Sequence, residues 1–399
     1  MEEWKEVRLG DYCDFQNGYA FKSSEFKTNG EYKIVKIKEL KDGLVKFFDD
    51  SASVDVQDIK EFEKYKIYRN DVLFALTGDP VSKPNPLSWV GRVSIYRSDE
   101  NALLNQRTCK IKKSEKFDNQ FLYYYFRQWD NFYALASKAT GSASQANIST
   151  NTIADTIIKL PPLPTQQKIA AILSSLDDKI ELNNRINTNL EQQAQALFKN
   201  WFVDFEPFGG KMPEGWKVGK LSEISILSAG GDKPTEVSDK ATEENKIPIY
   251  SNGLDNFGLY GYTNNAKIFE ESVTVSARGT IGFVCLRMEP YVPIVRLISV
   301  IPKTDFVSAK YLYLHLLNCN IAGTGTTQQQ LTVPAFSKEQ VIIPSKNVID
   351  SFTNTVKPFF ETIVHNRKEN ENLSCIRDTL LPKLMNGEIE TNSIIINKR

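Results

Sequence analysis

Residues 160–208 constrain the fold most, because they predict a helix longer than compact domains usually contain. Pro161, Pro162 and Pro164 fix φ and remove N–H donors, so a helix can begin only after this run. Residues 165–200 contain neither Pro nor Gly, and Pro207 followed by two glycines ends the element. About 36 helical residues extend over about 54 Å. A helix of that length needs a partner along its whole apolar face.

Apolar residues recur in this stretch at steps of three and four, which places them on one helical stripe. A second stripe follows Pro344 and is expected to end near Leu381–Pro382. The first stripe comprises Ile169, Ile172, Leu173, Leu176, Ile180, Ile186, Leu190, Ala194, Leu197 and Trp201, and the second Phe352, Val356, Phe359, Ile363, Leu373, Ile376 and Leu380. The alternative is a long core helix of one large domain.

The two halves of the chain repeat one plan, which disfavours that alternative. Three pairs lie 183 positions apart: Ile148 and Leu331, Pro161 and Pro344, Leu190 and Leu373. At the opening, Trp4 and Trp216 lie 212 positions apart, so the first half carries about 29 extra residues. The strand expected at 32–37 has a counterpart at 247–250, and the strand expected at 71–76 with its following loop has one at 272–280. Further elements expected in the two halves are strands at 90–96 and 108–111 and helices at 117–138 and 309–318.

The expected fold class is therefore α+β, with two mixed α/β domains separated by an antiparallel two-helix coiled coil and related by a pseudo-two-fold axis. The predicted boundaries are 1–160 for the first domain, 161–212 for the central helix, 213–344 for the second domain and 345–399 for the second helix with its tail. Asn183 and Asn366 are equivalent polar positions in the stripes. They indicate either a register-fixing seam or a local kink.

Composition is that of an ordinary globular protein, with 41% hydrophobic and 25% charged residues among 399. No apolar run is long enough for a membrane span, and the opening MEEWKEVRLG does not resemble a signal peptide. Five dispersed cysteines and two distant histidines favour reduced thiols in a cytoplasmic protein and disfavour a zinc site. Lys+Arg and Asp+Glu both total 49, so charge alone does not favour nucleic-acid binding.

The motifs of several enzyme classes are absent from the sequence. There is no Walker A loop, no G-x-G-x-x-G after a strand and no Asn/Asp-Pro-Pro-aromatic motif of amino-methyltransferases. The segment 277–282, ARGTIG, has two glycines, but its position after a strand favours a turn. The sequence thus predicts a binding protein without catalytic or metal-ligating residues and without a cofactor of its own.

The chain resembles the specificity subunit of type I restriction–modification systems over essentially its whole length. The most specific segments are LPTQQKIAAIL (163–173), LDDKI (176–180), FKNWFVDF (198–205) and IRDTLLPKLMNGEI (376–389). Two departures are Gln166, where relatives often have Glu, and Ser345-Lys346-Asn347 in place of a Pro-rich segment.

The resemblance implies that each domain is a target-recognition domain for one half of a split double-stranded DNA sequence. It also implies that the helices set the gap between half-sites and dock two methyltransferase subunits, and that restriction subunits with translocase activity can join. S-adenosylmethionine, ATP and Mg²⁺ would then belong to those partners.

Base reading needs polar side chains on loops that enter a groove. Arg107 and Arg278 are the strongest candidates, since a guanidinium can bind guanine with two hydrogen bonds. The candidates in the first domain are Asn17, Tyr19, Lys22, Ser23, Thr77, Lys83, Asn105, Gln106, Arg107, Ser142, Ser144 and Gln145. Those in the second are Lys233, Ser251, Asn252, Arg278, Thr280, Thr326, Gln328 and Gln329.

Each candidate has a competing interpretation as a solvated loop residue, and the loops at Ser144 and Gln328 can instead cap the junction with the helices. Two other functions compete with DNA reading. One is a protein-interaction scaffold built on the coiled coil, which the neutral charge supports. The other is a stand-alone nuclease, which the missing motifs disfavour.

Overall fold

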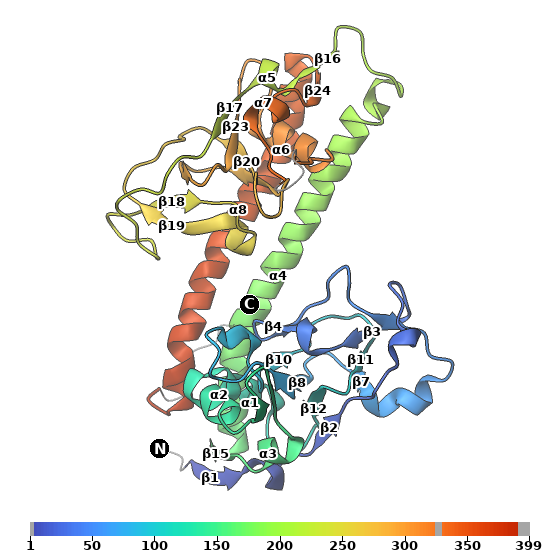
Figure 1. Ribbon diagram of the computed structural model, residues 1–399, viewed down its shortest axis with the longest axis vertical. Coiled ribbons are helices and arrows are strands. Elements are labelled where there is room, and N and C mark those ends of the chain that lie inside the picture. Colours follow the sequence, from blue (N-terminus) through green and yellow to red (C-terminus); the bar gives the residue numbers. More distant parts are fainter. Residues whose placement is uncertain (1–3, 324–328, 390–399) are drawn as a thin grey trace. The chain divides into compact units, whose positions relative to one another are not determined.

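The computed structural model describes residues 4–323 and 329–389, which form two compact units. Unit 1 comprises residues 1–181 and 369–399, and unit 2 comprises residues 182–368. Each unit therefore combines one globular part with a portion of both long helices (Figure 1). The expected boundaries treat those helices as separate segments, whereas compact packing assigns each portion to the core that it touches.

The two long helices are α4 (Leu163–Phe202) and α8 (Lys346–Met385), each with 40 residues. In unit 1 they run antiparallel, because Arg377 contacts Asp177 while Glu369 contacts Lys179. In unit 2 they also run antiparallel, and Asn366 donates to Asn187 at 2.8 Å. Asn366 and Asn183 are the two equivalent polar positions expected in the stripes. Asn183 is also buried, one turn away from Asn187.

Both helix ends differ from the expected ones. Helix α4 ends at Phe202, before Pro207, because Phe205 adopts a left-handed conformation with φ 56°. The N–H of Asp204 then donates to the carbonyl of Lys199 at 2.9 Å. Helix α8 does not end near Leu381–Pro382 but continues through Pro382 to Met385. A proline costs a helix one N–H hydrogen bond and some steric strain. Here the burial of Leu384 and Met385 in the core of unit 1 offsets that cost.

Most of the stripe residues are buried or half-buried, as predicted. They face the globular parts as well as the other helix. Ile169 and Leu173 belong to the core of unit 1, and Phe352 and Val356 to that of unit 2. Ile186 and Ile376 are wrong assignments, since they are 36% and 47% exposed. Phe360, at 3% exposed, lies deeper in the core than the predicted Phe359.

Unit 1 contains a sheet in the order β2-β12-β8-β10-β5-β4 and a smaller one in the order β6-β3-β11-β7. Helix α1 packs on β8 and β10. The strands are β1 (Lys5–Arg8), β2 (Phe15–Asn17), β3 (Tyr32–Val35), β4 (Leu40–Lys41), β5 (Leu44–Val45), β6 (Ser53–Val54), β7 (Lys66–Ile67), β8 (Val72–Ala75), β9 (Thr77–Gly78), β10 (Val93–Ile95), β11 (Ala102–Leu104), β12 (Thr108–Ile111), β13 (Thr140–Ser142), β14 (Gln145–Asn147) and β15 (Ile157–Leu160). The short helices are α1 (Asn119–Arg127), α2 (Trp129–Ala136) and α3 (Thr150–Ala154). The single helix expected at 117–138 is thus two, because Gln128 is extended between them.

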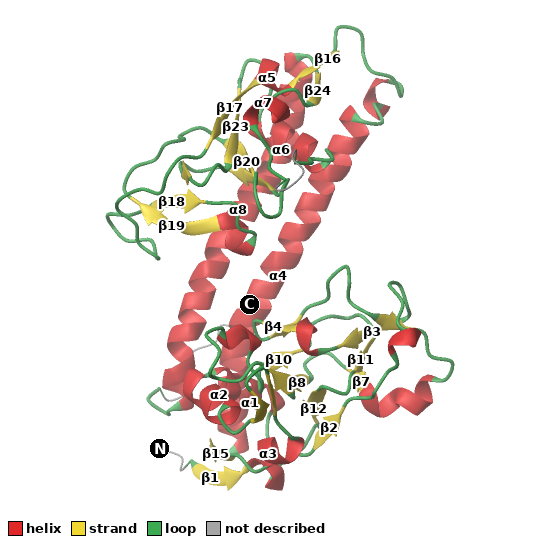
Figure 2. Ribbon diagram, in the orientation of Figure 1, coloured by secondary structure: helices red, strands yellow, loops and turns green. Residues whose placement is uncertain are grey.

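Unit 2 has the corresponding sheet in the order β17-β23-β20-β21 and a smaller one in the order β19-β18-β22 (Figure 2). Helix α6 packs on β20, β21 and β23. The strands are β16 (Lys217–Lys220), β17 (Ser225–Ala229), β18 (Ile247–Tyr250), β19 (Leu259–Thr263), β20 (Ser272–Val275), β21 (Val284–Arg287), β22 (Val292–Pro293), β23 (Ile298–Pro302) and β24 (Gln340–Ile343). The helices are α5 (Leu221–Ile224), α6 (Ala309–Leu317) and α7 (Val333–Phe336).

The internal repeat is confirmed by the strand pair that closes each unit. In unit 1, Lys5 of β1 pairs with Leu160 of β15, and in unit 2, Lys217 of β16 pairs with Ile343 of β24. Lys5 and Lys217 lie 212 positions apart, and Leu160 and Ile343 lie 183 positions apart. These are the two offsets found in the sequence. Ser149 and Thr332, again 183 apart, accept hydrogen bonds at the N-termini of α3 and α7. The frame is therefore repeated down to individual hydrogen bonds.

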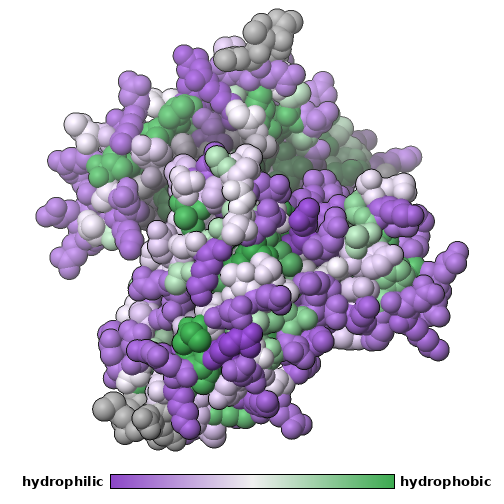
Figure 3. Space-filling model, turned by 60° about the horizontal axis from the view of Figure 1, so that its bottom comes forward, coloured by the Kyte–Doolittle hydropathy of each residue, from purple (hydrophilic) through white to green (hydrophobic). Residues whose placement is uncertain are grey.

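The face in Figure 3 carries mainly hydrophilic side chains, with small and separate hydrophobic patches. No helix in the described part of the chain is both long and apolar enough to cross a membrane.

Candidate nucleic-acid interface

Several predicted DNA-binding residues of unit 1 meet at one edge of its larger sheet. Strand β2 ends there at Asn17, β8 ends there at Ala75, and β12 begins there just after Arg107. Pairing fixes the arrangement, since Gly18 N–H donates to the carbonyl of Thr108 at 3.1 Å and Leu76 N–H to that of Arg107 at 2.9 Å. Asn17 and Arg107 are exposed at this edge.

The turn that carries Arg107 is held by the segment after β2. Tyr19 N–H donates to the carbonyl of Leu104 at 2.9 Å, and Gln106 N–H to that of Tyr19 at 3.0 Å. A Cβ on Gly18 would lie 2.0 Å from the carbonyl oxygen of Asn105, so only glycine permits this approach. Asn105 is 8% exposed, and its side-chain oxygen accepts from Gln106 N–H at 2.6 Å. Its amide therefore shapes the turn, while Gln106 and Arg107 are exposed.

A hairpin of β13 and β14 extends from the same edge and carries the exposed residues Ser142, Ser144 and Gln145. Strand β14 pairs with β9, where Thr77 is only 2% exposed. The Thr77 hydroxyl donates to the side-chain oxygen of Asn147 at 2.8 Å. Thr77 thus anchors the hairpin from a buried position, which removes its side chain from the surface on which the sequence placed it.

Lys22, Ser23 and Lys83 belong to loops that leave this edge. Lys22 and Ser23 open a short turn (Ser23–Glu25), after which Lys27 pairs with Ser53 of β6. The carbonyl of Lys83 accepts from the indole N–H of Trp89, which packs on α2. All three side chains are exposed.

Unit 2 presents the corresponding edge, where β17 ends at Ala229, β20 ends at Val275 and β23 begins at Ile298. Gly230 N–H donates to the carbonyl of Leu297 at 2.8 Å. Asn252 joins three segments there: its side-chain oxygen accepts from Ala277 N–H at 2.7 Å, and its NH₂ donates to the carbonyl of Val295 at 2.7 Å. This predicted base-contacting amide is therefore used within the protein.

Arg278, Thr280 and Gln329 lie together beside β20, and all three are exposed. Arg278 donates to the side-chain oxygen of Gln330 at 3.3 Å, and both line an open pocket of about 620 Å³ with Gln329. Gly279, with φ 68°, forms the turn that separates Arg278 from Thr280. Thr326 and Gln328 fall outside the described residues.

The two remaining candidates of unit 2 lie on other loops. The Lys233 ammonium is 5.1 Å from the centre of the Tyr260 ring, a distance typical of a cation–π contact. Ser251 is half-buried, and its N–H donates to the carbonyl of Gly258 at 2.8 Å.

Arg296 is a further exposed residue at the unit 2 edge, and the sequence interpretation missed it. It directly precedes Leu297, whose carbonyl accepts from Gly230. The available signal is the repeat, but its offset changes from 212 to 183 within the domain, so the sequence alone does not align the strands in between.

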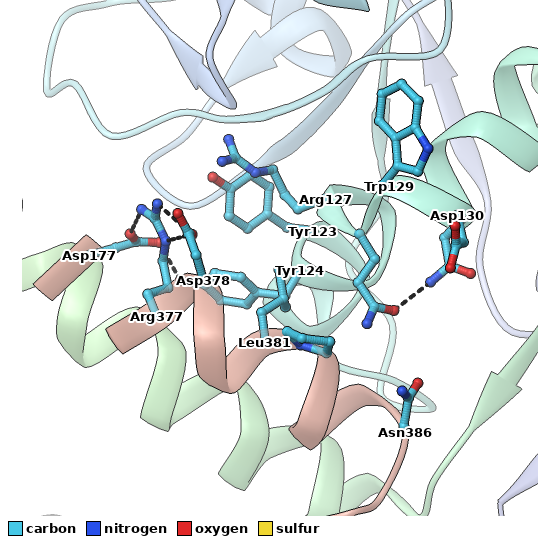
Figure 4. Close-up of a pocket in the computed structure, with 13 residues that line it drawn as sticks. Tyr123, Tyr124, Arg127, Trp129, Asp130, Asp177, Arg377, Asp378, Leu381 and Asn386 are labelled. Atoms are coloured by element: carbon cyan, nitrogen blue, oxygen red, sulfur yellow. Dashed lines mark hydrogen bonds and ion pairs between the residues drawn. The ribbon is translucent and has the colours of Figure 1, made fainter. Parts of the chain in front are cut away.

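A separate pocket of about 540 Å³ lies in unit 1 where α1 meets the long helices (Figure 4). Arg377 donates to one carboxylate oxygen of Asp177 at 2.7 Å, and Tyr124 donates to the other at 2.6 Å. Burial, reinforced by the Asp177 charge, raises the pKa of the Tyr124 hydroxyl, so it remains a donor. These groups satisfy one another and link α1, α4 and α8. Within residues 4–323 and 329–389, no cluster of three His, Cys, Asp or Glu residues suits a metal ion.

The sequence matches the family described as "Type I restriction modification DNA specificity domain" over residues 1–192 and 213–373. Similar curated proteins include the specificity subunit of the type I restriction enzyme HindI from Haemophilus influenzae, 28% identical over 98% of this chain and 100% of that protein. The specificity subunit of type I restriction enzyme MjaIX from Methanocaldococcus jannaschii is 27% identical over 76% of both chains.

A solved structure also resembles the chain. The crystal structure of a type I restriction–modification system S subunit from M. genitalium aligns with 96% of each chain and a TM-score of 0.62. At 17% sequence identity, this likeness supports the fold alone.

Proposed function

Since the chain belongs to the type I restriction–modification DNA specificity family and acts in DNA target recognition, we propose that each unit reads one half of a split DNA sequence. The observation that carries this proposal is the repeated sheet edge. Both units build it from equivalent strands, and each exposes different side chains on it. Gln106 occupies the edge of unit 1 where unit 2 has Val295, and Arg278 and Thr280 are further exposed residues of the unit 2 edge. Unlike side chains on like frames suit two unlike half-sites.

The chain in this proposal is a non-catalytic subunit. Its long helices would dock two methyltransferase subunits and set the gap between the half-sites, and restriction subunits could join that complex. S-adenosylmethionine, ATP and Mg²⁺ would bind to those partner subunits and not to this chain. The relatives named above are themselves specificity subunits of restriction enzymes, which supports this assignment.

The test is to express the chain with the methyltransferase subunit of its own restriction system and to map methylated bases across the host genome. We expect one motif with two specified halves separated by a fixed unspecified gap. DNA binding of the purified complex should also weaken steeply as salt rises, because phosphate contacts release counterions. An assembled complex that methylates no defined motif and binds DNA without salt dependence would instead favour the protein-interaction scaffold.

A further inference from the structure

Arg296 lies in a turn whose backbone is strained. Val295 and Arg296 have φ values of 52° and 62°, a left-handed conformation that is unfavourable for a non-glycine residue. For a β-branched residue such as Val295, this conformation is a genuine outlier. Such strain persists only where surrounding contacts impose it.

Three hydrogen bonds impose this turn. Val295 N–H donates to the carbonyl of Gly231 at 2.9 Å, and Arg296 N–H to that of Gly230 at 2.9 Å. The carbonyl of Val295 accepts from the Asn252 side chain at 2.7 Å. Because Asn252 also holds Ala277, the turn is tied to the strand that leads into Arg278.

The strained turn directs a cation into solvent. Val295 is 49% exposed, and the Arg296 side chain is exposed as well. Among the residues that the structure describes, the Arg296 guanidinium has no hydrogen-bond or ion-pair partner. The guanidinium is therefore available for a contact outside the chain, while the backbone that carries it is held in place.

The hydrogen-bond register identifies the counterpart of Arg296 in unit 1. Gly18 binds Thr108 where Gly230 binds Leu297, and Tyr19 binds Gln106 where Gly231 binds Val295. Leu297 lies 189 positions after Thr108, and Val295 lies 189 positions after Gln106. Arg296 also lies 189 positions after Arg107, so the two arginines occupy equivalent places. The strand pairs agree, since Asn17 faces Cys109 in unit 1 and Ala229 faces Ile298 in unit 2.

We infer that Arg107 and Arg296 are equivalent specificity-determining residues, each reading a guanine in the half-site of its own unit. This inference rests on the proposed function. The chemistry fits because a guanidinium fork donates two parallel hydrogen bonds to the O6 and N7 atoms of guanine in the major groove. A held backbone turn at the sheet edge reduces the motion that such a two-point contact must suppress.

The experiment compares the assembled complex of the wild type with Arg107→Gln, Arg296→Gln and Arg296→Lys variants on DNA libraries randomised in each half-site. Arg296→Gln should lower discrimination at one guanine of one half-site about tenfold and leave the other half unchanged. Arg107→Gln should do the same in the opposite half. Arg296→Lys should also lose discrimination, since Lys keeps the charge but lacks the fork.

Lys338→Gln is the matched control, because Lys338 is exposed in unit 2 on the turn between α7 and β24. It should leave both half-sites unchanged. Complex assembly and circular dichroism verify that each variant folds. Equal effects of Arg296→Gln on both halves, no effect, or a uniform loss with full rescue by Lys would each overturn the inference. A wild-type complex without any base preference would overturn the proposed function itself.

Discussion

The two units share one frame, but the groups that fasten the short helix to the long helices differ at one set of equivalent positions. In unit 1 the junction contains Tyr124, Asp177 and Arg377, joined by charged hydrogen bonds. The short helix α6 follows α1 at an offset of 190, so Leu314 of unit 2 stands where Tyr124 stands in unit 1. The long helices are related by an offset of 183, so Phe360 replaces Asp177 and Ala194 replaces Arg377. Those three residues of unit 2 are at most 3% exposed and belong to one apolar cluster.

Unit 1 also has ion pairs along α4, where Arg69 pairs with Glu181 at 2.6 Å and Arg97 pairs with Asp178. Where Trp4, Phe121 and Ile169 pack in unit 1, aromatic rings fill the same positions and their surroundings in unit 2. They are Phe198, Phe202, Trp216, Tyr311 and Phe352. The comparison teaches that the frame requires filled volume and paired polar groups, while the choice between ion pairs and aromatic packing is open.

The largest effect is expected from Phe360→Ala in the apolar junction. Removing this buried ring should lower the free energy of unfolding of unit 2 by about 3–5 kcal/mol, because it leaves a cavity. Hydrogen exchange of the β20 and β23 amides measures the loss, and the β8 and β12 amides of unit 1 serve as an internal reference. Phe359→Ala, at a half-buried position, is the matched control and should cost less. Equal losses in both units would contradict separate junctions.

A smaller effect is expected from Arg377→Met in the polar junction. The side chains of Arg377 and Asp177 are 19% and 17% exposed, so the variant leaves a largely buried carboxylate with fewer partners. Unit 1 should lose about 2–3 kcal/mol of unfolding free energy. Adding Asp177→Leu should recover part of the loss, because the unpaired charge is then gone. If the double variant is less stable than the single one, charge pairing is not what holds this junction.

The smallest effect is a pH response confined to unit 2. Burial lowers the pKa of His315, whose ring N–H donates to the carbonyl of Gln340 at 3.1 Å. Its counterpart in unit 1 is Tyr125, whose pKa is raised by burial. Below the ordinary histidine pKa of about 6.5, the unfolded chain therefore takes up this proton more readily than folded unit 2 does. Stability falls as pH decreases through that value, by at most about 1.4 kcal/mol at pH 5.5.

Hydrogen exchange at pH 7.5 and 5.5, corrected for intrinsic rates, measures this response in each unit. A His315→Gln variant should remove the difference between the units. His365→Gln is the control, since His365 is exposed on α8. A selective loss in unit 2 that persists in His315→Gln would assign the response to other groups.

Much of the fold could be predicted because local patterns decided it. The strand expected at 108–111 is β12, and the helix expected at 309–318 is α6 within one residue. The errors occurred where neighbours override local preference. Gln128 breaks one predicted helix into two, and Pro382 fails to end another. Both outcomes depend on packing that periodicity does not encode.

The candidate site was predictable only in outline. Loops rich in polar residues pointed to Arg107 and Arg278, and both are exposed beside strand ends, because strand ends expose their connecting turns. The direction of individual side chains was not predictable. Thr77 and Asn252 are polar loop residues like the others, yet the fold uses both for internal hydrogen bonds.

The sequence by itself determined the two long helices and the repeated frame with its two mixed α/β domains, because periodicity and constant offsets act along the chain. Only the tertiary structure decided which residues of the edge face outward. Hydrogen bonds between strands distant in sequence set that register, and they equate Arg107 with Arg296 through an offset of 189, between the 212 and 183 seen in the sequence. An offset that changes within a domain is fixed by pairing across the sheet and cannot be inferred from either half alone.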